Sequence, residues 1–398
     1  MKPEIIAEIE GEYGPLTISE RLVQKIWARG EFRRTDLKTL EGSSLEIVDL
    51  GKWNLLAGPD FKDVSILVDG QKISGDAELH FFESDWEAHG HETDPAFRNV
   101  VLHILVFPPK ARRRLVQCSV DNSLLFLELL PQGLESYAEE EALGALTVGS
   151  EPALSETLLT MPLSDRLSLL VDSAHKRWRG KVVYARKRIE ALGWEEACHQ
   201  TALEILGYRY NRAVMLFVAG DYSLNALRSG NYKAADLYEA GQRRWRVSGT
   251  RPANHPRQRL EQYLDWVGQR PLWPDEMEGF LHKLPRVEND QVLEVRRKDL
   301  ELNSVRSALS KTVLADTVGG TRIENLVSDG FLPLLAAQSD RTLFSVWFHW
   351  FPGDVPAVMK QVSKEVTAGA SRPIPICNGG LQGILQQLLD LTAPTREK

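Results

Sequence analysis

Histidines gather in one short part of the sequence, residues 58–107. This segment holds four of the nine histidines in the chain, at His80, His89, His91 and His103. Imidazole nitrogens bind transition metals, and a histidine near its ordinary pKa can also activate water. The segment is therefore the first place to look for chemistry.

Two carboxylates in the same segment point to a hydrolytic site. Asp60 and Glu78 together could hold Mg²⁺ or Mn²⁺, because hard cations prefer oxygen ligands. His80 would then act as the base or as a third ligand. Such a constellation suits metal-assisted hydrolysis of a phosphodiester bond.

The other histidines allow different interpretations. His89, His91 and Asp94 form one polar loop, which we expect to support the site together with His103. With His80 or His103, the same loop could form a transition-metal site of nitrogen and oxygen ligands. Alternatively, these side chains are hydrogen-bonded structural residues, since buried polar groups need partners whether or not chemistry occurs.

The elements that must position these residues can be predicted in outline. We expect residues 1–18 to form an irregular arm. A helix capped at residues 17–19 should then run to Arg29, and Gly30 should end it. Strands follow at residues 45–56, 64–68 and 73–82. A short helical turn comes next, and the last strand spans residues 99–107.

The hairpin between the second and third strands decides whether the carboxylates meet. Asp69-Gly70 predicts a two-residue turn, and its register would place Asp60 opposite Leu79. Directly opposed residues share a face, so Asp60 would then point away from Glu78 and His80. A three-residue loop, or a bulge near Lys62-Asp63, would instead set Asp60 opposite His80.

Composition excludes several classes of protein. The net charge of −7 gives no general attraction to nucleic acid, so binding would need a local basic patch. No apolar run is long enough for a membrane span, and the three separated cysteines fit a reducing cytoplasm. We expect a cytoplasmic protein of undetermined oligomeric state. Without a Walker A or dinucleotide motif, no nucleotide cofactor is expected.

The chain is long enough for two domains. An acidic, glycine-containing stretch predicts a linker at 136–157, between an α/β domain at 1–135 and a helical domain at 158–398. The fold class is therefore α+β, with a central sheet first and an all-α domain after it.

A basic and aromatic cluster in the predicted helical domain could bind nucleic acid. Arg244, Trp245, Arg251 and Arg257 are its main members. Arginine can grip phosphate with paired hydrogen bonds, and tryptophan can stack on bases. The alternative is a solvated helix face whose arginines tie helices together.

The segment resembles an uncharacterised bacterial family, domain of unknown function 2851. The shared motifs are a GPDF turn, a Gly-x-x-Glu-x-His strand, an SDW-x-x-HGH-x-x-D segment and an Asn-Val-x-Leu-His strand, here within residues 58–103. Residues 251–259, and Asn325 with the FLPLLA that follows, resemble later elements of the family. Many members have a cysteine-rich tail, but this chain has only Cys377 there, so a zinc-binding tail is not expected.

The same segment is weakly similar to the PD-(D/E)xK nuclease core. That core has a helix, three strands, a helix and a strand, with an Asp before the second strand and Glu-x-Lys on the third. Asp60 and Glu78 match, and Glu20 could supply an additional carboxylate. His80 stands where the lysine should be, so Lys62 or Lys72 would have to provide the positive charge. The resemblance implies a metal-dependent nuclease; the alternative is a non-catalytic binding or scaffold protein.

Overall fold

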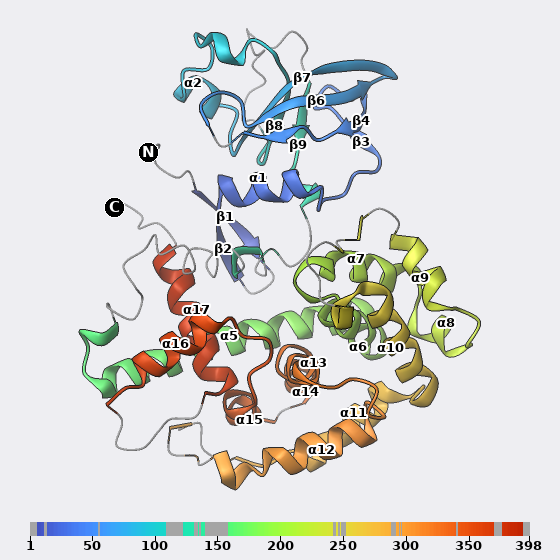
Figure 1. Ribbon diagram of the computed structural model, residues 1–398, viewed down its shortest axis with the longest axis vertical. Helices are drawn as coiled ribbons and strands as arrows, with labels where there is room; N and C mark the ends of the chain where they lie inside the picture. Colours follow the sequence, from blue (N-terminus) through green and yellow to red (C-terminus); the bar gives the residue numbers. More distant parts are fainter. Residues whose placement is uncertain are drawn as a thin grey trace. The chain divides into compact units, whose positions relative to one another are not determined.

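A computed structural model gives the architecture of the protein (Figure 1). It describes residues 6–11, 14–54, 56–108, 122–130, 134, 137–139, 158–241, 244–245, 247, 252–287, 292–293, 295, 297–339, 341–369 and 376–392.

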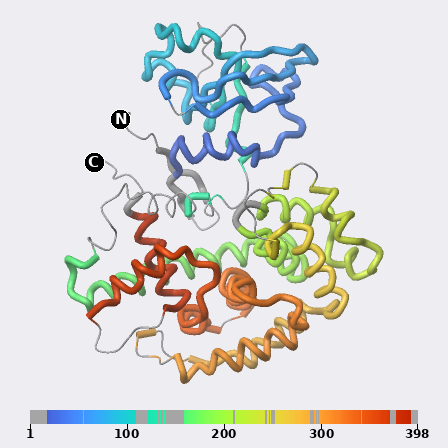
Figure 2. Tube along the Cα trace, viewed as in Figure 1, coloured from blue at the N-terminus to red at the C-terminus, as the bar shows by residue number. Residues whose placement is uncertain are grey.

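The chain forms two compact units, which Figure 2 traces from blue to red. The N-terminal unit contains Pro15–Ala138 with the first strand, and the helical unit contains Glu139–Ala393. A mixed α/β unit followed by a helical one confirms the predicted fold class. The linker expected at 136–157 falls mostly outside the described residues, so its limits remain a prediction.

The N-terminal unit begins with two strands and a helix. β1 (Ile6–Gly11) pairs with β2 (Gly14–Ser19), so the irregular arm expected for residues 1–18 is wrong. α1 (Glu20–Arg29) starts where Ser19 Oγ accepts the Leu22 N–H at 3.2 Å. It ends at Gly30, whose φ of +64° is left-handed, as predicted from the sequence.

Among the described residues of this unit, seven strands form a central mixed sheet. Its strands are β3 (Leu37–Lys38), β4 (Ser44–Asp49), β5 (Lys52–Trp53), β6 (Phe61–Val68), β7 (Gln71–His80), β8 (Val100–Leu105) and β9 (Ser123–Leu125). The order is β3-β4-β6-β7-β8-β9, and β5 pairs with β6. The pairs from β3 to β7 are antiparallel, whereas β7, β8 and β9 run parallel.

The two faces of the sheet differ in chemistry. α1 packs on the apolar face, where Trp27 is fully buried in one hydrophobic cluster with Phe61 and Leu79. Alternate residues of β7 point to the other face, and these are Asp76, Glu78 and His80. All three are buried although they are polar. A short helix, α2 (Asp85–Ala88), and a 3₁₀ turn, η1 (Pro95–Phe97), connect β7 to β8.

The β6–β7 hairpin turns at Asp69-Gly70, where both residues have positive φ, as the sequence predicts. Farther from the turn, Val64 pairs with Gly75, but the next pair joins Phe61 to Ala77. β6 therefore holds one more residue than β7 in this interval, which confirms the bulge expected near Lys62-Asp63. Asp63 has a φ of +62° within it.

The bulge changes the partner of Asp60. Continuing the pairing beyond Phe61 places Asp60 across from Glu78, not His80 as predicted. The error has a physical cause: the extra residue lies in β6, which shifts the partner toward the start of β7. Opposed residues share a face, so Asp60 belongs to the polar face of the sheet.

The helical unit contains no strand among its described residues. Its helices are α5 (Leu163–Leu192), α6 (Trp194–Leu206), α7 (Tyr208–Asp221), α8 (Leu224–Arg228), α9 (Ala234–Gly241), α10 (Pro256–Gln269), α11 (Trp273–Phe280), α12 (Leu302–Thr312), α13 (Thr321–Asn325), α14 (Leu332–Gln338), α15 (Phe344–His349), α16 (Ala357–Val366) and α17 (Asn378–Thr392). A π-helical turn, η7 (Leu326–Phe331), joins α13 to α14. Buried tryptophans such as Trp266, Trp273 and Trp347 fill its core.

None of the helices within the described ranges combines the length and apolar character needed to cross a membrane.

The bulge gives a test of the register that positions the site. A left-handed φ suits glycine and strains a β-branched residue by about 1–3 kcal/mol. We therefore expect Asp63→Val to destabilise β6 and β7 by that amount relative to Asp63→Gly. Both variants lose the same exposed ion pair with Lys52, which makes them a matched pair. Hydrogen exchange of the two strands measures the difference, and equal protection in both variants would contradict the assigned backbone.

Candidate metal centre

Two hydrogen bonds join Asp60 to Glu78 and to its neighbour Leu79. The Asp60 N–H donates to Glu78 Oε2 at 2.8 Å, and the Leu79 N–H donates to Asp60 Oδ2 at 3.1 Å. Each carboxylate thus receives a backbone donor of the opposite strand. This arrangement places the two predicted carboxylates side by side, and it leaves Glu78 Oε1 directed elsewhere.

The connection between β7 and β8 brings two more histidines over the same face. Gly90 has a φ of +72°, which lets the chain turn sharply between His89 and His91. The loop is anchored by apolar packing, since Trp86 and Phe97 are buried together and His91 stacks on Phe97 at 3.7 Å between ring centroids. The histidines are consequently held by an aromatic support, not left on a solvated loop.

Three histidines converge at one point. His80, His89 and His91 each offer a nitrogen atom, and these atoms all lie within 4.8 Å of one another. His80 Nε2 is 3.1 Å from His89 Nδ1. Such spacing is close enough for one ion to contact all three after small adjustments of the rings.

Glu78 adds an oxygen to this group. Its Oε1 lies 3.2 Å from His91 Nε2 and 3.6 Å from His80 Nε2. The side chains of Glu78, His80 and His91 are buried, whereas His89 is half-buried and reaches solvent. The converging donors are therefore three imidazoles, with the Glu78 carboxylate beside two of them, and nitrogen ligands of this kind are typical of sites for Zn²⁺ and related transition metals.

His103 supports His80 from the neighbouring strand. Parallel pairing sets it beside Glu78, and its Nε2 is 2.9 Å from His80 Nδ1. Burial, with a smaller contribution from His91, lowers the pKa of His103 to about 3, so the ring is neutral near pH 7. When His80 Nδ1–H donates to His103, the lone pair of His80 Nε2 points at the other histidines. A partner of this kind orients a metal-binding histidine.

Lys62 and Asp76 extend the polar face beyond the histidines. Lys62 Nζ is 2.9 Å from Asp76 Oδ2, and Asp76 lies two residues before Glu78 on the same face of β7. Asp76 was not predicted as a site residue. The sequence signal was its strand spacing with Glu78 and His80, because residues at i, i+2 and i+4 line one face.

Other predicted site residues lie apart from the three histidines. Asp94 is exposed and caps η1, accepting the Ala96 N–H at 2.8 Å, so its role is in the loop backbone. Lys72 lies one residue from the hairpin turn, at the far end of β7 from His80. Glu20 starts α1, whose buried residues pack on the apolar face.

The predicted nucleic-acid cluster is only partly described. Trp245 is buried in the helical core, where it stacks on Tyr238 and donates from Nε1 to the Tyr238 carbonyl at 2.6 Å. This placement argues against the predicted role of Trp245 in base stacking. Arg244 is exposed over the Phe217 ring, and Arg257 is exposed beside Glu261. Arg251 lies outside the described residues.

Comparison with known proteins gives one match. The family model described as "Protein of unknown function (DUF2851)" matches residues 20–240, which is more than half of the chain. The candidate metal centre lies entirely within the matched residues, whereas the two later motifs noted in the sequence do not. No curated protein and no solved structure matches.

The convergence of ligands predicts stoichiometric metal binding. We expect one equivalent of Zn²⁺ or Mn²⁺ to bind, and to raise the free energy of unfolding by about 2.7 kcal/mol at a free metal concentration of 100 Kd. His89→Ala and His91→Ala should weaken binding about 100-fold or more, because each removes a ligand. Calorimetric titration and thermal melts measure both quantities. His282→Ala, at an exposed histidine of the helical unit, is the control and should change neither; equal loss in all three variants would reject the assigned ligands.

Proposed function

The chain belongs to the DUF2851 family, and because that membership names no activity, we propose from the site itself that the protein is a metal-dependent hydrolase. The proposed substrate is a phosphodiester bond in nucleic acid. Glu78, His80, His89 and His91 would hold the metal, and Asp60 lies beside them.

The observation that carries this proposal is the convergence of three imidazole nitrogens, with a carboxylate oxygen of Glu78 beside two of them. Buried histidines and carboxylates of different elements rarely converge unless their interactions compensate for lost solvation. A divalent cation would do so by binding all four groups. This donor set favours a transition metal such as Zn²⁺ or Mn²⁺ over Mg²⁺, which prefers oxygen ligands.

The order of elements supports a nuclease over other hydrolases. A helix, α1, precedes the antiparallel strands β4, β6 and β7, and α2 then leads to β8, which is parallel to β7. That is the order expected for the PD-(D/E)xK core, although fold analogy is weaker support than the site chemistry. In this proposed correspondence Asp60 and Glu78 would take the two carboxylate positions, which is supported by their closeness in space.

Lys62 supplies the positive charge that His80 lacks. It comes from the strand next to Glu78 and approaches the same face through Asp76. Its side chain is 38% exposed, so it could leave Asp76 to contact a phosphate oxygen. A lysine at this place would stabilise negative charge developing on the phosphate, as the lysine of Glu-x-Lys does in the expected pattern.

Each residue then has a distinct role. When bound, the metal supplies a polarised water or phosphate oxygen. Glu78 and His80 hold it from β7, and the neutral His103 fixes the orientation of His80. His89 lies nearest to solvent, which makes it the ligand beside which a substrate would enter.

A second function is favoured by the burial of the site. Four protein ligands fill a tetrahedral zinc site, and closed sites of that kind are structural. Glu78, His80 and His91 are each at most 5% exposed. The N-terminal unit would then be a non-catalytic binding or scaffold module in which the metal pins the β7–β8 connection.

Cleavage assays distinguish the two functions. We expect the protein loaded with Zn²⁺ or Mn²⁺ to cleave fluorescent single-stranded DNA, duplex DNA or RNA. Asp60→Asn and Glu78→Gln should lower kcat by about 100-fold or more, comparable with the loss of a principal stabilising group. His282→Ala should retain full activity. Metal binding that stabilises the protein without cleavage of any of these substrates would favour the scaffold.

Lys62 allows chemistry to be separated from metal binding. Lys62→Met should reduce kcat by about 10²-fold while metal affinity stays unchanged, because Lys62 pairs with Asp76, which is not one of the proposed ligands. Lys72→Met removes the same charge near the turn and is the matched control, with expected wild-type kinetics. A parallel loss of metal affinity in Lys62→Met would show that the lysine only maintains the fold of the site.

A further inference from the structure

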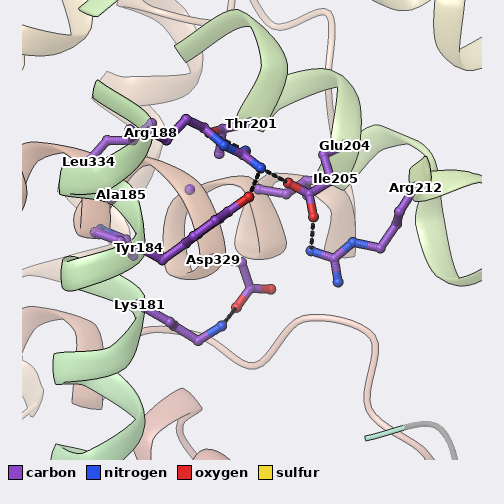
Figure 3. A pocket seen from close by; sticks show the side chains of 12 residues that line it. Lys181, Tyr184, Ala185, Arg188, Thr201, Glu204, Ile205, Arg212, Asp329 and Leu334 are labelled. Carbon is purple, nitrogen blue, oxygen red and sulfur yellow. Dashed lines mark hydrogen bonds and ion pairs between the residues drawn. The ribbon is translucent and has the colours of Figure 1, made fainter. Parts of the chain in front are cut away.

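The helical unit contains a small polar cavity that is independent of the metal centre. Residues from α5, α6, α7, η7 and α14 line it (Figure 3). Its walls carry five charged side chains, namely Lys181, Arg188, Glu204, Arg212 and Asp329. Charged groups are costly to bury, so their concentration at one cavity calls for an explanation.

Arg188 and Glu204 form the inner wall. Arg188 Nη2 is 2.9 Å from Glu204 Oε2, and its Nη1 donates to Thr201 Oγ1 at 2.9 Å. Figure 3 shows Tyr184 beside the same guanidinium group, and their hydrogen bond completes the wall. These contacts fix the guanidinium group in one orientation.

Arg212, Lys181 and Asp329 form the outer part. Arg212 approaches Glu204 at 3.3 Å from the side opposite Arg188, and Lys181 Nζ contacts Asp329 at 3.0 Å. The side chains of Arg212 and Asp329 keep 31% and 21% exposure. The cavity is therefore reached past Arg212 and Asp329.

The charges that line the cavity do not balance. Burial alone would raise the pKa of Glu204, but Arg188 and Arg212 outweigh it and hold that pKa below its usual value. Lys181 and Arg212 likewise outweigh burial at Asp329 and lower its pKa. Both carboxylates are thus ionised near pH 7. The lining also contains three cations, Lys181, Arg188 and Arg212. Three positive and two negative charges leave the described lining residues with one excess positive charge.

Stability does not explain this arrangement. Buried ion pairs are often no more stabilising than apolar residues of the same volume, because desolvation offsets their attraction. The backbone is also specialised: Asp329 lies in the π-helical turn η7, a rare conformation that is frequent at functional sites. A Cβ on the adjacent Gly330 would approach Ile205 within 2.9 Å, so η7 is pressed closely onto α6.

We propose that this cavity binds one phosphate group of a phosphorylated ligand or of a nucleic-acid backbone. A phosphodiester carries a single negative charge, which matches the excess. Its tetrahedral oxygens can be shared among two guanidinium groups, an ammonium and a hydroxyl, whereas a planar carboxylate offers only two oxygens.

The size of the cavity limits how the phosphate enters. Its volume of about 20 Å³ accommodates a water-sized group, such as one phosphate oxygen. The remaining oxygens would lie at the mouth, within reach of Arg212 and Lys181. Glu204 and Asp329 hold the cations in place and set the net charge.

The test uses two probes and variants with opposite expected effects. Inorganic phosphate is titrated by calorimetry and a labelled single-stranded DNA oligonucleotide by fluorescence anisotropy, both with EDTA to empty the metal centre. Arg212→Gln should weaken phosphate binding about tenfold or more, the loss of one charge-assisted contact. Asp329→Asn should tighten binding by a similar factor, because it removes a competing negative charge. A misfolded variant cannot produce that gain.

Arg186→Gln is the matched control. Arg186 lies on α5 but is exposed and not part of the lining, so its removal changes net charge without changing the cavity. Stronger binding of the oligonucleotide would identify a nucleic-acid backbone as the source, and stronger binding of phosphate a small phosphorylated ligand. Absence of saturable binding to either, equal losses in Arg212→Gln and Arg186→Gln, or no gain in Asp329→Asn would overturn the proposal.

Discussion

The carboxylate of Asp76 holds the irregular part of β6 in place, since its oxygens accept from Lys62 Nζ at 2.9 Å and from the Asp63 N–H at 3.3 Å. Through this contact the extra residue of β6 is accommodated, and the strand beyond it changes register. Asp60 then meets Glu78 on the polar face. In an uninterrupted hairpin Asp60 would have faced the apolar core, where an ionised carboxylate is strongly disfavoured.

Local signals were sufficient to predict α1 and the hairpin turn, because Ser19, Gly30 and Asp69-Gly70 act within a few residues of chain. Which of the two strands carries the extra residue was not predictable, because this depends on contacts that β6 makes with Asp76 of β7. The burial of Trp245 was not predictable for a similar reason: a tryptophan flanked by arginines gives the same sequence pattern whether its ring is buried or exposed. His89 and His91 were expected to support the site, yet packing around Trp86 and Phe97 brings them to its centre.

Burial gives His103 a property that its sequence spacing does not show. In water an imidazole is protonated part of the time, but burial lowers the pKa of His103 to about 3 and so favours its neutral form. A neutral ring has one N–H and one lone pair, so each hydrogen bond fixes where the lone pair points. His103 has no hydrogen-bond partner at Nδ1 among the described residues and engages His80 only through Nε2. Orientation of His80 therefore depends on this contact.

The histidines on the sheet and the charged residues at the helical cavity differ in whether burial can neutralise their side chains. A neutral imidazole presents a nitrogen lone pair, and the convergence of His80, His89 and His91 beside Glu78 is the arrangement on which the proposed cation site rests. Guanidinium groups cannot be neutralised near pH 7, so Arg188 and Arg212 require Glu204 between them. Because the cations still outnumber the carboxylates among the lining residues, the ligand that we propose for that cavity is an anion. The different protonation chemistry of imidazole and guanidinium is therefore the basis on which we propose a cation for the sheet and an anion for the helices.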